Sequence, residues 1–97
     1  MNRDMHPAAA TLDKIVSASV RRAPAAEAPL LAWPLTCGSA VAQRTRAIDF
    51  QKGTLHVEVA DIGWRNELQA LAPKYLATIN RYVEQKVLRI EFVIRRS

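Results

Sequence analysis

The segment Gly53–Tyr82 constrains the fold most, because its hydrophobic period changes near Asp61 from two residues to about 3.6. Before Asp61, apolar residues alternate with polar ones, which predicts a strand over residues 54–60 with one apolar face. After it, apolar residues recur at the three- and four-residue steps of one helical face: Trp64, Leu68, Leu71, Tyr75, Ile79 and Tyr82. The Asp61 carboxylate can cap this helix. A strand that leads into a long amphipathic helix is therefore the framework of the fold.

Two further strands are predicted on either side of this framework. Residues 45–50 form the first, with Ile48 and Phe50 inward, and a short turn with Gly53 at positive φ joins it to the next strand as a hairpin. Residues 87–95 alternate again, with four apolar side chains on one face: Leu88, Ile90, Phe92 and Ile94. Pro73 removes a hydrogen bond from the long helix, so we expect two helical pieces that meet near Ala72.

The N-terminal third is predicted to be helical and divided by a linker. Residues 8–20 carry an apolar stripe of Leu12, Ile15, Val16 and Val20, which predicts a short helix that packs loosely on the domain or contacts a partner. Residues 21–29 contain two prolines and are expected to form a linker. A second helix is predicted over residues 30–44, starting or kinking at Trp33 or Pro34 and passing close to another element at Gly38. Its inward residues are Leu30, Trp33, Cys37, Ala40 and Val41.

The order of these elements predicts an α+β fold, a two-layer sandwich of helices on a three-stranded sheet. We divide the chain into an N-terminal segment, residues 1–26, and one domain, residues 27–97. The length of 97 residues suits a single domain.

Charge and cysteine content indicate the class of partner and the compartment. The chain has 14 basic and 9 acidic residues, a net charge of +5, which makes a polyanion the first partner to consider. A single cysteine excludes an internal disulfide and a cysteine-based zinc site, and it suits a reducing compartment. Neither a signal peptide nor a membrane span is apparent. We therefore expect a cytoplasmic protein that does not contact membranes.

Catalytic motifs are absent from the sequence. His56 and Glu58 alternate on the wet face of a strand, where an ordinary exposed pair is a better interpretation than an acid/base dyad. Cys37 lies on an apolar stripe, which favours an inert thiol. No phosphate-binding loop, dinucleotide fingerprint or metalloprotease motif occurs. We expect no enzyme, cofactor, metal or small-molecule substrate.

Basic residues carry the remaining functional signal. They flank the first strand and its hairpin, lie off the apolar stripe of the long helix, and continue into the final strand. Flexible cations along a groove can bind phosphates, and a solvated basic surface explains the same pattern equally well. The candidate nucleic-acid-binding residues are Arg44, Arg46, Lys52, Arg65, Lys74, Arg81, Lys86 and Arg89.

The order of residues over about 30–95 resembles the DciA-like family of bacterial replicative-helicase loaders. The segment GTLHVEVADIGWRNEL carries most of the resemblance, together with Trp33, Gly38, Ala42, Thr45, Leu71, Leu76, Asn80, Ile90 and Phe92. The resemblance implies a KH-like order of helix, strand, strand, helix, helix and strand, here with an extra N-terminal helix. It also implies binding to single-stranded or forked DNA and to the replicative helicase. KH domains clamp nucleic acid with a GXXG loop, but this chain has Ala72-Pro73-Lys74 at that junction.

Two functional hypotheses remain from the sequence. The first is a DNA-binding accessory factor that assists loading or operation of the helicase. The second is a protein-interaction module without DNA contact, acting through the N-terminal stripe defined above or through an exposed sheet edge. An enzyme that uses His56 is a distant third.

Overall fold

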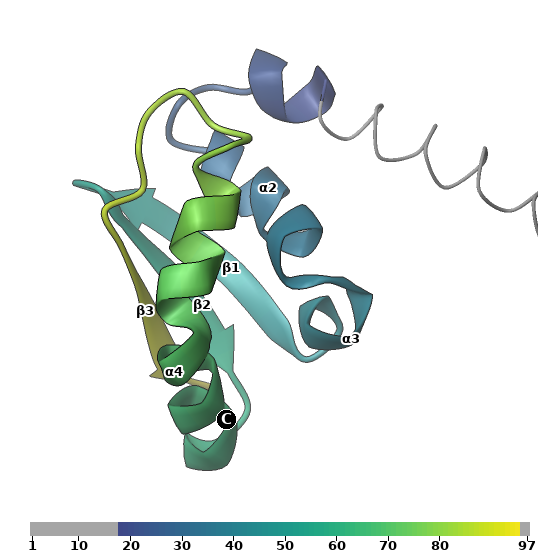
Figure 1. The fold of residues 1–97 in the computed structure, drawn as a ribbon, viewed down its shortest axis with the longest axis vertical. Helices are drawn as coiled ribbons and strands as arrows, with labels where there is room; N and C mark the ends of the chain where they lie inside the picture. Colours follow the sequence, from purple (N-terminus) through teal and green to yellow (C-terminus); the bar gives the residue numbers. More distant parts are fainter. Residues whose placement is uncertain (1–17, 96–97) are drawn as a thin grey trace, which may run out of the picture.

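The computed structural model describes residues 18–95, in which helices cover one face of a three-stranded sheet (Figure 1). The predicted α+β class and three strands are confirmed. A helical turn at residues 18–22 comes first. The elements that follow are α2 (Ala28–Cys37), α3 (Ser39–Ala42), β1 (Thr45–Gln51), β2 (Thr54–Val59), α4 (Ile62–Ile79) and β3 (Arg89–Ile94).

The sheet has the order β1-β2-β3 and combines an antiparallel hairpin with a parallel strand. Gln51 pairs with Thr54, so Lys52 and Gly53 form a two-residue turn, and both have positive φ, 51° and 80°. Positive φ at both positions is what a type I′ turn requires, and such turns match the twist of the paired strands. The predicted hairpin and the positive φ of Gly53 are therefore confirmed.

The first strand contains an irregularity that the sequence did not reveal. Ala47 pairs with Val57 but Asp49 pairs with His56, so Ile48 is an extra residue in a β-bulge. The bulge takes Ile48 out of the core, where its predicted position was wrong, and leaves it 38% exposed. It also allows Phe50 to point inward, as predicted.

The change of period at Asp61 marks the start of α4. The Asp61 carboxylate accepts a hydrogen bond from the Trp64 amide at 3.0 Å, which confirms the predicted N-cap. The predicted break at Pro73 is wrong, because α4 continues through it as one helix. Pro73 and Gln69, whose carbonyl loses its bonding partner, are both exposed, so water can satisfy that carbonyl. One helix therefore stands where the KH-like order has two.

Trp33 lies at the centre of the core and joins both layers. Its side chain is 2% exposed and packs edge-on against Tyr75 of α4, with ring centroids 5.2 Å apart, and against Phe92 of β3 at 6.0 Å. Its indole Nε1 donates to Thr45 Oγ1 at 2.9 Å, and that hydroxyl donates to the carbonyl of Val41 at 2.8 Å. One buried side chain thus ties α2 to α4, β3 and the start of β1.

Besides Ile48, three residues of the strands and the long helix that were predicted inward lie outside the core. Leu88 is 70% exposed, and Leu71 and Ile94 are each 42% exposed. In α4 the small side chain of Ala72 is buried instead of Leu71. Leu88 lies over the hairpin, where a Cβ added to Gly53 would come 2.7 Å from its Cδ1 atom.

The segment before β1 also differs from the prediction. The predicted linker is mostly a turn between the helix at residues 18–22 and α2, which begins at Ala28 with Pro29 in its first turn, where proline is tolerated. The break falls at Gly38, whose φ is 85°. A Cβ there would meet nothing within 4 Å, so positive φ, not close approach, accounts for this glycine. Ala40, predicted inward, is exposed.

The predicted N-terminal helix lies largely outside the described residues. Leu12, Ile15 and Val16 are not described, whereas Val20 is 2% exposed and belongs to the core. Among the described helices, none combines the length and the apolar character needed to cross a membrane.

Candidate nucleic-acid interface

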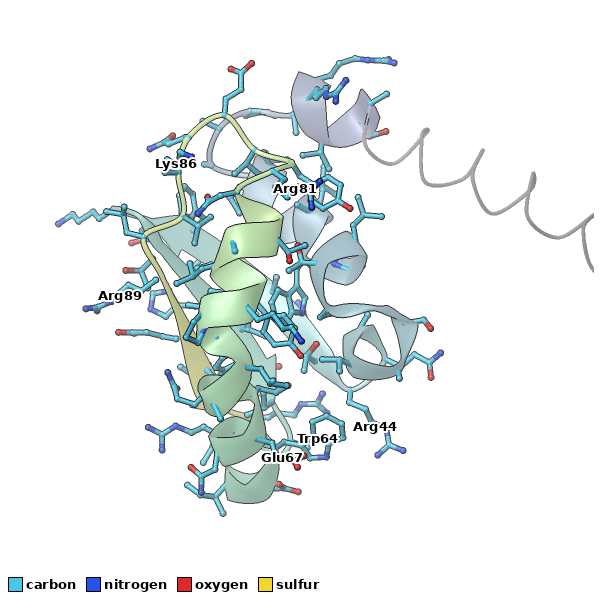
Figure 2. The ribbon with its side chains drawn as sticks, viewed as in Figure 1. Arg44, Trp64, Glu67, Arg81, Lys86 and Arg89 are labelled. Carbon is cyan, nitrogen blue, oxygen red and sulfur yellow. The ribbon has the colours of Figure 1, made fainter. Side chains whose placement is uncertain are left out.

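All eight predicted cations are exposed, but the fold divides them between two ends of the domain. We define the hairpin end as the end that holds the β1–β2 turn, the start of β3 and the end of α4. It carries Lys52, Arg81, Lys86 and Arg89. The opposite end holds the start of β1 and the start of α4, with Arg44, Arg46 and Arg65, and Lys74 lies between on α4. Figure 2 shows Arg81 and Lys86 at one extreme and Arg44 at the other.

At the hairpin end, Arg81 shares a shallow hollow with Arg21, a residue that sequence reasoning did not select. The hollow has a volume of about 250 Å³ and is lined by Arg21, Thr78, Arg81 and Tyr82. Among residues 18–95, neither arginine has a carboxylate oxygen within 4.0 Å. Two guanidinium groups without a counter-charge at one hollow suit an anion such as a phosphate.

Asn80 holds the loop that carries Arg81 and Lys86. Its side-chain amide donates to the Val87 carbonyl at 3.0 Å, and the Val87 amide donates back to Asn80 Oδ1 at 2.7 Å. Val87 is itself 2% exposed. These two bonds close residues 81–86 into a loop between the end of α4 and β3, so Asn80 positions the basic residues of the hairpin end.

Arg89 is held by a row of charged residues on the uncovered face of the sheet. His56 Nδ1 lies 2.6 Å from Asp49 Oδ1, and His56 Nε2 lies 3.2 Å from Glu91 Oε1. The second carboxylate oxygen of Glu91 lies 2.6 Å from Arg89 Nη2. Because register places these residues on three adjacent strands, the row crosses the whole sheet. Arg89 is therefore a weaker candidate for phosphate binding than Arg81.

The cations at the opposite end are partly engaged. The Arg44 guanidinium carbon lies 5.9 Å from the centroid of the Trp64 ring, a cation–π distance (Figure 2). Arg46 stands opposite Glu58 in the strand register. Trp64 is half-buried and already covered on one side by Arg44, so it offers little surface for base stacking.

The described residues also show what chemistry is disfavoured. Burial raises the pKa of the Cys37 thiol to about 11, and its own backbone hydrogen bond only partly offsets this, so the reactive thiolate is scarce at neutral pH. His56 bonds to Asp49 and Glu91 instead of the Glu58 partner considered from the sequence. Within residues 18–95, no group of three or more metal-binding side chains is placed to hold an ion.

Sequence reasoning missed Arg21 because the signal is tertiary. Residue 21 was assigned to a linker, and only the packing of Val20 into the core brings it against the end of α4. The local signal was the apolar stripe that ends at Val20, directly before Arg21.

Comparison with known proteins identifies one family. A family model described as "Dna[CI] antecedent, DciA" matches residues 7–92, which confirms the resemblance noted from the sequence. The match spans most of the chain and includes Arg21, Arg81 and Asn80. No curated protein matches the chain.

Proposed function

The chain belongs to the DciA family, which is linked to loading of the replicative helicase, and we propose that it is a cytoplasmic DNA-binding accessory factor. In this proposal it assists loading or operation of the bacterial helicase by holding single-stranded or forked DNA. The observation that supports DNA binding is the hollow lined by Arg21 and Arg81, neither of which has a carboxylate partner among the described residues.

The proposed mode of binding is contact with phosphates. The hollow is lined by two arginines and by Tyr82, whereas the Thr78 hydroxyl already donates to the Lys74 carbonyl at 3.1 Å. Lys86 and Lys52 extend positive charge over the same end of the domain. Such contacts displace counterions and read no sequence, so affinity depends steeply on salt and weakly on base composition. No enzymatic step is part of this proposal, and the role needs only binding.

A relation to KH domains belongs to the same proposal. The order α2, α3, β1, β2, α4, β3, with a crossover through α4 to a parallel β3, supports it. Because α4 is continuous and lacks a GXXG loop, the proposal places the DNA at the hairpin end and not at a helix–helix clamp.

Fluorescence anisotropy with labelled single-stranded and forked oligonucleotides tests the proposal. If about four phosphates are contacted, the slope of log affinity against log salt is roughly −3 for single strands. The double variant Arg21→Gln/Arg81→Gln should lower the magnitude of that slope by about 1.4 and weaken binding to all sequences alike.

Arg89→Gln is the control, because it makes the same substitution, once, at an exposed arginine that Glu91 already engages. It should change the slope by less than about 0.3. An effect of Arg89→Gln as large as that of the double variant would contradict the assignment of DNA binding to Arg21 and Arg81. Absence of DNA binding by the wild-type chain at low salt would contradict the proposal that it binds DNA.

The second hypothesis, a protein-interaction module, named two possible surfaces: the N-terminal stripe and an exposed sheet edge. Val20 of the stripe is buried in the core, so the stripe is not wholly available to a partner. The uncovered edge of the sheet at β3 is the better protein surface.

A further inference from the structure

β3 forms one edge of the sheet, and within the described residues no strand pairs with its outer side (Figure 1). The other edge, β1, is interrupted by the bulge at Ile48, and its first residue, Thr45, is tied to α2 and α3 by hydrogen bonds. A bulge is one of the devices that prevent an edge strand from pairing. β3 pairs with β2 over six residues without a shift in register. Only β3 therefore offers a regular edge.

The direction of the β3 amides follows from two hydrogen bonds. The Arg89 amide donates to the Gly53 carbonyl at 3.1 Å, and the Arg95 amide donates to the Val59 carbonyl at 2.7 Å. Backbone groups of successive strand residues point in opposite directions, so within β3 those of Ile90, Phe92 and Ile94 point away from β2. Ile90 and Phe92 are 3% and 4% exposed, whereas Ile94 is 42% exposed, so the accessible part of the edge is at Ile94.

A groove follows the second half of this edge. It has a volume of about 480 Å³ and is lined by Arg65 of α4 and by Phe92, Val93, Ile94 and Arg95. Ile94 is 42% exposed, so the groove offers apolar surface beside the free amides. Arg65 has no carboxylate within 4.0 Å among the described residues, and Arg95 lies 3.6 Å from Glu58. The groove thus places the exposed apolar side chain of Ile94 beside two arginines.

We propose that the β3 edge at Ile94 binds an extended acidic segment of a partner protein. The backbone of Ile94 forms hydrogen bonds with the segment, the Ile94 side chain contacts an apolar side chain, and Arg65 and Arg95 attract its carboxylates. This surface is separate from the hollow of Arg21 and Arg81, so the inference goes beyond the proposed function.

The charges favour this occupant over two others. A second copy of the chain would bring Arg65 and Arg95 and a net charge of +5 against the same groups. A nucleic acid strand could offer phosphates to the arginines, but it lacks the peptide backbone that pairs with the donor and acceptor of an edge strand. An acidic extended peptide satisfies both the backbone and the arginines.

A synthetic fluorescein-labelled peptide of alternating Glu and Val, titrated with the full chain, tests the proposal by anisotropy. Ile94→Pro removes one outward amide without removing a bond to β2, and Ile94→Ala is its matched control because it loses the side chain but keeps the amide. Relative to Ile94→Ala, Ile94→Pro should weaken peptide binding at least about tenfold. A peptide of alternating Lys and Val should not bind.

Equal affinity of the two variants, or no saturable binding of the Glu–Val peptide, would overturn the proposal. Loss of single-stranded DNA binding or of self-association in Ile94→Pro alone would also overturn it, by assigning the edge to another occupant. If Ile94→Pro fails to fold by circular dichroism, Arg65→Glu/Arg95→Glu decides instead. These side chains are exposed, so the double variant should fold. It must lose affinity for the Glu–Val peptide and gain affinity for the Lys–Val peptide.

Discussion

Replacing Asn80 by alanine tests whether the loop at the hairpin end is held as the structure indicates. The change removes two hydrogen bonds, at 3.0 and 2.7 Å, and leaves the amide and carbonyl of the buried Val87 without their partner. A neutral hydrogen bond contributes about 1 kcal/mol, and unpaired buried groups cost about 1–3 kcal/mol. Since Asn80 itself is half-buried, we expect a loss of about 2 kcal/mol.

Urea unfolding followed by the fluorescence of Trp33 and Trp64 measures this loss, and for a domain of this size it corresponds to a fall in Tm of about 10 °C. Asn80→Asp keeps the acceptor for the Val87 amide but places an oxygen against the Val87 carbonyl, so its stability should fall between those of the wild type and Asn80→Ala. The alanine variant should also bind DNA more weakly, because Arg81 and Lys86 lose their fixed loop. A loss below about 0.5 kcal/mol would refute the reasoning.

Three further outcomes are expected. Gly53→Ala should lower the free energy of unfolding by about 1–2 kcal/mol in the same urea assay, because φ at residue 53 is 80° and the added Cβ meets Leu88. Unchanged stability would contradict the positive φ of Gly53 in this turn. His56→Ala should lower stability by at most about 1 kcal/mol, since its contacts with Asp49 and Glu91 are partly exposed, and it should leave DNA affinity unchanged. A loss of DNA affinity would place His56 in the interface. Cys37 should react slowly with a thiol reagent at pH 8, whereas fast labelling of the folded protein would contradict its burial.

The raised pKa values also predict how stability varies with alkaline pH. Burial raises the pKa of Cys37 to about 11. Burial also raises the pKa of Tyr75, and the negative charge of a Cys37 thiolate raises it further. The folded chain therefore binds these protons more tightly than the unfolded chain. Their contribution is fully present below the thiol's ordinary pKa of 9.0 and is lost as pH rises toward 11. Urea midpoints that stay constant across this range would contradict the prediction.

The sequence predicted the parts of the fold that local rules determine. The change of period at Asp61, its cap on α4 and the turn at Lys52 and Gly53 all follow from side-chain spacing and backbone preference, and the structure confirms them. Ile48 was misplaced because a bulge shifts the alternation by one residue, and its position depends on pairing with β2.

Most of the remaining errors arise from tertiary context. Pro73 does not break α4, because Gln69, whose carbonyl it leaves unpaired, is exposed, and solvent exposure is a property of the packed helix. The candidate cations were chosen from one-dimensional spacing, which does not show that the fold divides them between two ends. Arg89 and Glu91 are two residues apart on β3, so strand alternation could have shown that Glu91 engages Arg89. The burial of Val20 brings Arg21 to Arg81, and that contact cannot be predicted from local spacing.

The central claim, that this domain brings DNA to the replicative helicase through its hairpin end, is tested most directly by helicase loading on a forked oligonucleotide. Purified helicase is mixed with the labelled fork, and the fraction of fork that carries helicase is measured with and without the full chain. We predict that the wild-type chain raises this fraction, and that Arg21→Gln/Arg81→Gln still binds the helicase but raises it far less. An unchanged fraction with the wild-type chain, or equal loading by the double variant, would contradict the account.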